Sequence, residues 1–145
     1  MKKTLIVLLA LLAPMTLAAG EDPIEQREEL MEETREAIKP LGAMAKGERD
    51  FDAEVVRSSL QTFKHSAKHF GGLFPAGTET GGGTEAKSTI WTDRDGFNQA
   101  LKDFSQAVDA AIEANPQSVN ELKPVLGSIG KTCKGCHDGY RVKDD

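Results

Sequence analysis

The stretch Cys133-Lys134-Gly135-Cys136-His137 lies close to the end of the 145-residue sequence and contains its only two cysteines. Cys-x-x-Cys-His is the pattern by which haem is attached covalently to c-type haem proteins. The two thiols can form thioether bonds to the haem vinyl groups, and the histidine that follows can ligate the iron from one side. The sequence therefore predicts one covalently attached haem c, bound through Cys133 and Cys136, with His137 as an iron ligand.

The spacing of this motif fits a helix. Residues at positions i, i+3 and i+4 share one helix face, so Cys133, Cys136 and His137 would point together into the interior. Two other interpretations stay open. A zinc site could combine both cysteines with two histidines, because His65 and His69 are four residues apart. A thioredoxin-like dithiol would need a strand and helix context that the sequence lacks. Outside a metal site, His65 and His69 are predicted to be surface residues.

The first twenty residues have the three parts of a secretory signal peptide. Lys2 and Lys3 form a basic start, residues 4–13 are almost entirely apolar, and residues 17–20 are mostly small. The alternative is an uncleaved membrane anchor, but the apolar stretch is shorter than the ~20 residues of a spanning helix. We therefore expect residues 1–20 to be removed, residues 21–145 to form one domain, and the mature protein to be periplasmic with no membrane attachment.

Residues 21–145 show no alternating strand pattern and predict an all-α domain. Asp22 suits an N-cap, Pro23 the first helical position, and Gly47 the end of the same helix. Pro40 lies inside this helix and predicts a kink. Four helices joined by one long connection predict an antiparallel four-helix bundle. The helices are expected at residues 22–47, 51–70, 93–115 and from 118 almost to the end, with the Gly-rich connection at residues 71–88.

The charge of the chain limits its partners. The net charge is −5 at pH 7, and no basic patch is present that would neutralise phosphates, which argues against a nucleic-acid partner. An acidic surface suits a basic redox partner protein. A solvated acidic face with no partner role explains the same charge equally well.

Several stretches beyond the haem motif resemble one family. They are Leu-Gly-Ala-Met-Ala-Lys-Gly at 41–47, Phe-Pro-Ala-Gly-Thr at 74–78, Ala-Lys-Ser-Thr-Ile-Trp at 86–91 and the whole of 130–141. Together with a haem motif near the C-terminus, they resemble the cytochromes c', the class II c-type cytochromes. The resemblance covers essentially all of residues 21–145. It implies a four-helix bundle and an exported electron carrier or gas-binding haem protein, not an enzyme.

The resemblance also bears on the second iron ligand. High-spin members of the family leave the sixth iron position open, and members of the cytochrome c-556 kind fill it with a methionine of the first helix. Met31, four residues after Arg27, matches the methionine-ligated branch. A plain core methionine is the alternative, and Met44 is a second candidate that lies over three turns away. Only one of the two can face the iron, because thirteen residues of helix span roughly 20 Å.

Secondary haem contacts follow from the resemblance at further positions. Arg27 and Glu28 lie one turn before Met31, and Lys102 lies where the family has another contact. The remaining candidates around the haem are Trp91, Phe97 and Arg141. For each of them, an ordinary surface or core role is an equal alternative.

The predicted function is one-electron transport by a monohaem cytochrome with Met31 and His137 on the iron. If Met31 is not bound, the alternative is a high-spin cytochrome c' that binds NO or CO at an open distal site. The expected partners are redox proteins. A homodimer through the first two helices is a further implication of the resemblance, which the sequence neither supports nor excludes.

Overall fold

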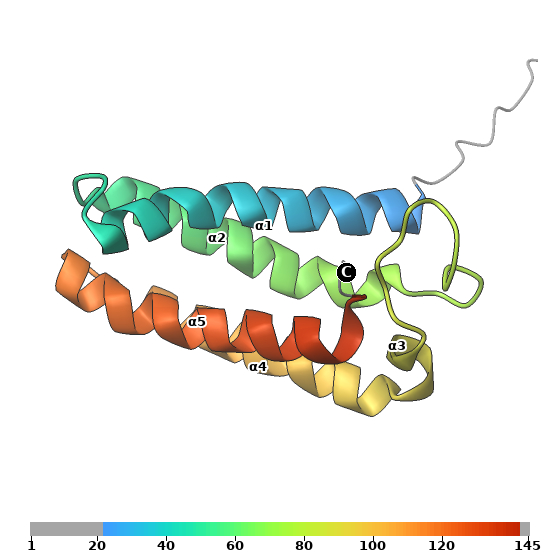
Figure 1. The fold of residues 1–145 in the computed structure, drawn as a ribbon. Coiled ribbons are helices and arrows are strands. Elements are labelled where there is room, and N and C mark those ends of the chain that lie inside the picture. The colour runs from blue at the N-terminus through green and yellow to red at the C-terminus, as the bar shows by residue number, and fades with distance from the viewer. Residues whose placement is uncertain (1–21, 143–145) are drawn as a thin grey trace, which may run out of the picture.

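The computed structural model describes residues 22–142, and the predicted signal peptide lies outside them. Four long helices form an antiparallel bundle (Figure 1), which confirms the predicted all-α fold. Among the described residues there is no strand, only an isolated antiparallel bridge between Ala86 and Arg141. None of the described helices combines the length and apolar character that a membrane span requires. The long helices are α1 (Pro23–Lys46), α2 (Ala53–His69), α4 (Arg94–Ala114) and α5 (Val119–Tyr140).

Local capping chemistry sets the ends of these helices. The Asp22 carboxylate accepts the backbone N–H of Ile24 at 2.9 Å, and Gly47 ends α1 with a left-handed φ of 78°. Glycine adopts this conformation without the steric cost that a Cβ would bring. The second helix begins two residues later than predicted, because Asp52 is its N-cap and accepts the N–H groups of Glu54 and Val55. The α1 helix continues through Pro40 as one element.

The connection between α2 and α4 is more ordered than predicted. It begins with the 3-10 turn η1 (Phe70–Leu73) and ends with the short helix α3 (Thr89–Thr92). Its second half is fixed to the end of α5, where Lys87 N–H donates to the Tyr140 carbonyl and Val142 N–H donates to the Glu85 carbonyl. These long-range bonds have no local sequence signal, which is why the stretch resembles an unstructured connection.

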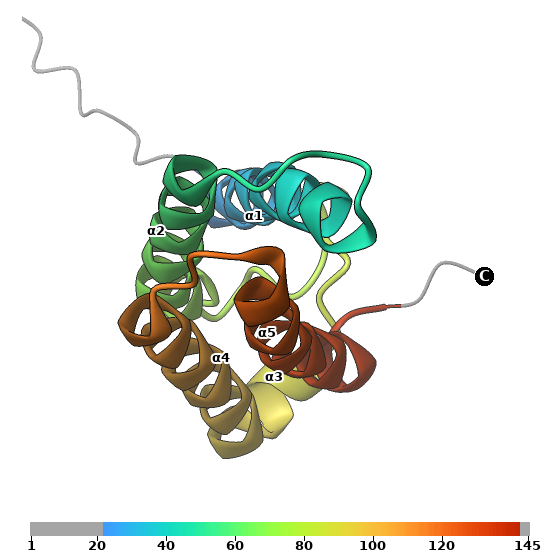
Figure 2. The ribbon, with the colours of Figure 1, turned by 90° about the vertical axis from the view of Figure 1, so that its left-hand side faces the viewer.

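The interior consists of two apolar clusters at opposite ends of the bundle. The larger cluster fills the end that lies away from the connection, and its centre includes Phe63, Leu122 and Met44. The smaller cluster is aromatic and is built around Phe74, Ile90 and Phe97 beside the connection. Viewed end on, the four helices form a ring in the order α1, α2, α4, α5 (Figure 2). Within this ring, α1 and α5 share the smallest contact, so the packing is loosest between the helices that carry Met31 and His137.

Candidate functional site

A cavity of about 520 Å³ has the three buried residues of the smaller cluster, Phe74, Ile90 and Phe97, in its wall. Cys133, Cys136 and His137 of α5 line it, and Met31 of α1 lines it as well. Residues that are about a hundred positions apart in the sequence therefore meet at one site. Most of the wall is apolar or aromatic, and it includes Ile24, Ile38, Phe70, Phe74, Ile90, Phe97, Leu101 and Phe104.

These walls fit a haem. The volume falls in the range of roughly 300–1,000 Å³ that is usual for cofactor sites, and such sites are mainly apolar with a few polar groups. Both cysteines are free thiols and half-buried at the cavity, so they are available for thioether bonds. An imidazole and a thioether sulfur are both known iron donors. The donor set and the cavity therefore suit a covalently attached haem with its iron near His137.

Burial controls the chemistry of the two thiols. It raises the pKa of Cys133 and is the main cause that raises the pKa of Cys136 to about 11, with the neighbouring Cys133 adding to the shift. Both side chains are therefore neutral thiols at pH 7. A neutral thiol is a poor nucleophile and a poor metal ligand, which argues against a redox-active dithiol at this site.

The environment of His137 favours the form that can ligate a metal. Burial lowers the pKa of His137, and the positive charge of Arg141 lowers it further, while Glu85 and Asp138 act in the opposite direction. The imidazole is therefore neutral at pH 7, and a neutral imidazole has the free lone pair that a metal requires. Arg141 is in turn ion-paired with Glu85 through its Nε, at 2.5 Å.

The two candidate methionines lie in different places. Met31 is half-buried and faces the cavity. Met44 is fully buried in the larger apolar cluster, where it packs with residues such as Leu41 and Leu122, and it does not line the cavity. Of the two, only Met31 is placed on the same cavity as His137.

Arg27 lines the cavity, but its guanidinium is directed at the connection. The side chain is only 5% exposed. Its Nε donates to the Leu73 carbonyl at 2.6 Å, and its two Nη groups donate to the carbonyl and hydroxyl of Thr78 and to the Thr84 hydroxyl. The guanidinium carbon also lies 4.2 Å from the centre of the Phe74 ring. A guanidinium has five N–H donors, and these contacts use all five. Arg27 therefore fixes the connection to α1.

Replacing Arg27 with lysine should release this connection. A lysine keeps the charge but cannot reach these four acceptors, because it lacks the fixed fork of a guanidinium. We expect the free energy of unfolding to fall by about 1–3 kcal/mol, because hydrogen bonds to a charged group are lost and buried carbonyls are left unpaired. Amide hydrogen exchange at residues 73–84 should become faster. The control is Arg57→Lys on the exposed face of α2, which should change stability by less than about 0.5 kcal/mol. Equal effects of the two substitutions would contradict the role assigned to Arg27.

The other predicted haem contacts are distributed unevenly. Glu28, Phe97 and Arg141 line the cavity. Lys102 is exposed on α4 and is not among the lining residues, although the adjacent Leu101 is. Trp91 lies behind the wall, with its ring 5.7 Å from that of Phe74 and its indole N–H donating to the Pro75 carbonyl.

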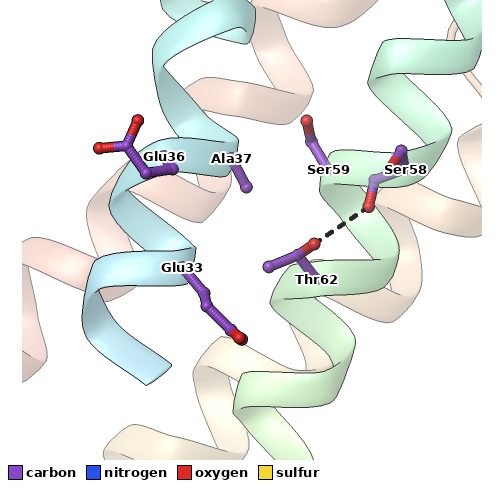
Figure 3. Close-up of a pocket in the computed structure, with 6 residues that line it drawn as sticks. All are labelled: Glu33, Glu36, Ala37, Ser58, Ser59 and Thr62. Carbon is purple, nitrogen blue, oxygen red and sulfur yellow. Dashed lines mark hydrogen bonds between the residues drawn. The ribbon is translucent and has the colours of Figure 1, made fainter. Parts of the chain in front are cut away.

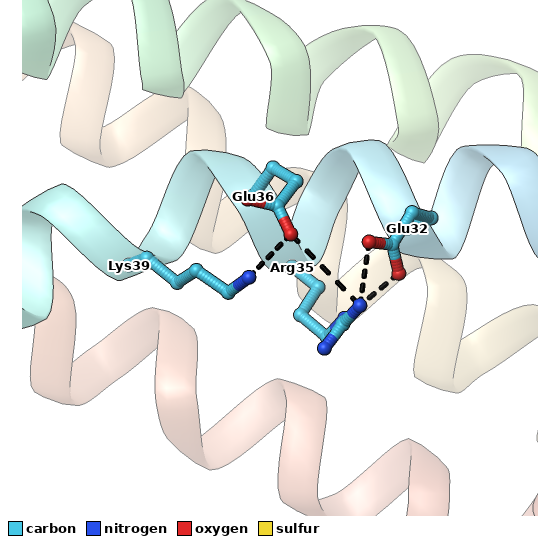
Figure 4. A network of polar contacts seen from close by, with 4 residues as sticks. All are labelled: Glu32, Arg35, Glu36 and Lys39. Atoms are coloured by element: carbon cyan, nitrogen blue, oxygen red, sulfur yellow. Dashed lines mark hydrogen bonds and ion pairs between the residues drawn. The ribbon is translucent and has the colours of Figure 1, made fainter.

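Charged residues that the sequence did not single out stand at the edge of the cavity. Glu32, Arg35 and Glu85 line it. Arg35 forms two hydrogen bonds to the Glu32 carboxylate, and the next turn of α1 continues this network with Glu36 and Lys39 (Figure 4). Hydrogen bonding from Arg35 lowers the pKa of Glu32. The acidic side chains are thus partly neutralised within α1.

A separate groove of about 410 Å³ lies on the outside of the bundle between α1 and α2. Glu33, Glu36 and Ala37 form one wall, and Ser58, Ser59 and Thr62 form the other (Figure 3). It contains no cysteine or histidine. In the part of the chain that the structure describes, no group of three or more His, Cys, Asp or Glu side chains is arranged to hold a metal ion. The alternative zinc site that joins the cysteines to His65 and His69 is therefore not formed.

Comparison with known proteins finds relatives in one family. The family described as "Cytochrome C'" matches residues 22–141. A cytochrome c' of Rhodopseudomonas palustris is 38% identical over 125 residues, which cover 86% of this chain and 85% of the relative. A cytochrome c-556 of the same organism is 33% identical over 149 residues, which cover 99% of both chains. The solved structure of cytochrome c' from Rhodopseudomonas palustris superposes with a TM-score of 0.80 at 36% identity, and the match covers 86% of this chain and 98% of that one.

Proposed function

The chain belongs to the cytochrome c' family, and from this membership we propose that it is an exported one-electron carrier whose haem iron is ligated by Met31 and His137. Proteins of this family bind one covalently attached haem c and are electron carriers or gas binders rather than typical enzymes. The resemblance to the cytochrome c-556 subtype is supported by the relatives of that name. The observation that carries the proposal is the position of Met31, which lines the same cavity as His137.

Each residue of the cavity has a distinct part in this proposal. Cys133 and Cys136 would hold the haem by thioether bonds, His137 would ligate the iron from α5, and Met31 would ligate it from α1. The bound haem supplies the iron that changes between its ferrous and ferric states. The surrounding helices contribute rigidity and an apolar environment, which keep both ligands in place and exclude water. Arg27 contributes by holding the connection against the cavity.

A second function is supported by the names of the relatives. Proteins named cytochrome c' and proteins named cytochrome c-556 match this chain with similar identities. If Met31 does not bind the iron, the same apolar cavity would leave an open position for NO or CO. The choice between carrier and gas binder therefore depends on one side chain.

An absorption spectrum of the reduced, purified protein tests the proposal. A carrier with two protein ligands should show sharp low-spin bands that do not change when CO is added. The physical reason is that CO can bind quickly only where the iron has an open position. A broad high-spin spectrum that shifts at once with CO would instead support the gas-binding alternative.

The proposal also includes the location of the protein and its partner. We infer a periplasmic location from the predicted signal peptide, and a basic redox protein as partner from the net charge of −5. The outer groove between α1 and α2 carries the carboxylates of Glu33 and Glu36. The homodimer stays a prediction.

A further inference from the structure

Two histidines outside the haem cavity lie side by side on α2. His65 and His69 are both exposed, and their ring centres are 4.4 Å apart with an angle of 38° between the ring planes. Positions i and i+4 share one face of a helix, so both imidazoles project to the same side. Neither ring has a hydrogen-bond or ion-pair partner among residues 22–142. We propose that His65 and His69 form a binding site for a divalent transition-metal ion, with Cu²⁺ bound most tightly.

The helix holds this pair in position. Ser66, which lies between the two histidines in sequence, is fully buried and its hydroxyl is 2.8 Å from that of Thr34 on α1. Phe63, in the preceding turn, is also fully buried. This turn of α2 is therefore fixed against the bundle, and only side-chain torsions need to be ordered when a metal binds. Ordering fewer groups costs less free energy, which favours binding.

The local charges allow a cation at this place. His69 is the last residue of α2, and the C-terminal end of a helix carries a partial negative charge that favours cations. The ammonium group of Lys64 is 3.0 Å from Asp109 on α4, which offsets its positive charge. Lys68 is exposed, so its charge is screened by solvent. Among residues 22–142, no third His, Cys, Asp or Glu side chain joins the two imidazoles, so water would fill the remaining positions of the ion.

The chemistry of the ligands identifies the class of ion. Imidazole nitrogens suit Cu²⁺, Ni²⁺ and Zn²⁺, whereas Mg²⁺ and Ca²⁺ prefer oxygen ligands. Within the first-row series, affinity for such a site rises to Cu²⁺ and falls again at Zn²⁺. The site is separate from the haem cavity, since neither His65 nor His69 lines it. Ser66 and Phe70 do line it, so the ion would lie on the outer face of a helix whose inner face forms part of the cavity wall.

Calorimetric titration of the haem-loaded protein with Ni²⁺, together with electron paramagnetic resonance of added Cu²⁺, tests the proposal. We expect one ion per chain, nitrogen coupling in the copper signal, and no change in the haem absorption bands. His65→Asn and His69→Asn should each weaken binding at least about tenfold, because the second imidazole of a chelate binds at a high effective concentration. Both positions are exposed, so these variants should fold like the parent.

A rescue variant provides the matched control. Gln61 is exposed and lies four residues before His65, so adding Gln61→His to the His69→Asn variant creates a new pair with the same spacing. This variant should recover most of the lost affinity. Single variants that bind like the parent, a parent that does not saturate at one ion, or a rescue variant as weak as His69→Asn would each overturn the proposal. None of these readouts depends on whether Met31 ligates the haem iron.

Discussion

Replacing Met31 with leucine should convert a low-spin, CO-insensitive haem protein into a high-spin protein that binds CO. Leucine has a volume similar to that of methionine, so the wall of the cavity is largely preserved, and such exchanges usually cost less than about 1.5 kcal/mol of stability. Leucine has no sulfur, so the iron would lose its sixth ligand. The measurements are the absorption spectrum of the reduced protein and a CO titration.

The reduction potential gives an independent readout of the same change. A methionine and histidine pair raises the potential of a haem iron, because the thioether favours the ferrous state. The potential of the Met31→Leu variant should therefore be lower than that of the parent. A merely structural role for Met31 would leave the spectrum and the potential close to their parent values.

The second methionine supplies the matched control. Met44 is fully buried in the larger cluster and lies away from the cavity. Met44→Leu should leave the spectrum, the CO response and the potential unchanged, although it alters the core to a similar degree. If Met31→Leu leaves the spectrum of the parent intact, Met31 is not the ligand. If Met44→Leu abolishes the low-spin bands, the ligand has been assigned to the wrong methionine.

The parts of the fold that could be predicted from the sequence are those set by local chemistry. As expected, α1 begins after Asp22 and ends before Gly47. The Asp22 carboxylate accepts a backbone N–H of the first turn, and the left-handed Gly47 donates its own N–H to carbonyls of the last turn. For the same reason, α4 begins after its N-cap Asp93 and ends before its C-cap Asn115. The apolar stripe of α2 is set by local spacing too, because Val56, Leu60 and Phe63 recur at helical spacing and are buried.

The connection could not be predicted in this way. Arg27 holds residues that lie 46 to 57 positions further along the chain, and two of its four acceptors are backbone carbonyls. A carbonyl is present at every residue, so no sequence pattern marks the ones that will accept. The resemblance implies that Arg27 is a haem contact, and this role stays a prediction, whereas the structure shows that its donors are directed at the connection.

The sequence also predicts some positions in the site better than others. The shared face of Cys133, Cys136 and His137 follows from helix geometry alone, and the structure places all three on the cavity. The position of Lys102 depends on a rotation of about 100° per residue. This rotation directs Leu101 toward the cavity and leaves Lys102 in solvent. An assignment that is displaced by one residue therefore exchanges a wall residue for a surface residue.

Replacing both cysteines with serine should abolish covalent haem attachment completely while leaving the proposed iron ligands Met31 and His137 in place. Serine cannot form a thioether bond, but His137 and Met31 can still bind the iron of a haem that enters the cavity without covalent bonds. Under denaturing acid extraction, all haem should leave the Cys133→Ser/Cys136→Ser variant. The parent should retain its haem, and so should each single variant, which keeps one thioether. Haem that stays with the double variant would show that the attachment lies elsewhere.

Thermal unfolding of this double variant distinguishes the covalent attachment of haem from its binding through Met31 and His137. A reversible ligand stabilises the folded state by an amount that grows with its free concentration, about 2.7 kcal/mol at a hundred times its Kd. The melting temperature of the double variant should therefore rise as haem is added. The covalently loaded parent should show no such dependence, because its haem remains attached when the chain unfolds. A melting temperature of the double variant that is independent of added haem would mean that the cavity does not bind haem through Met31 and His137 alone.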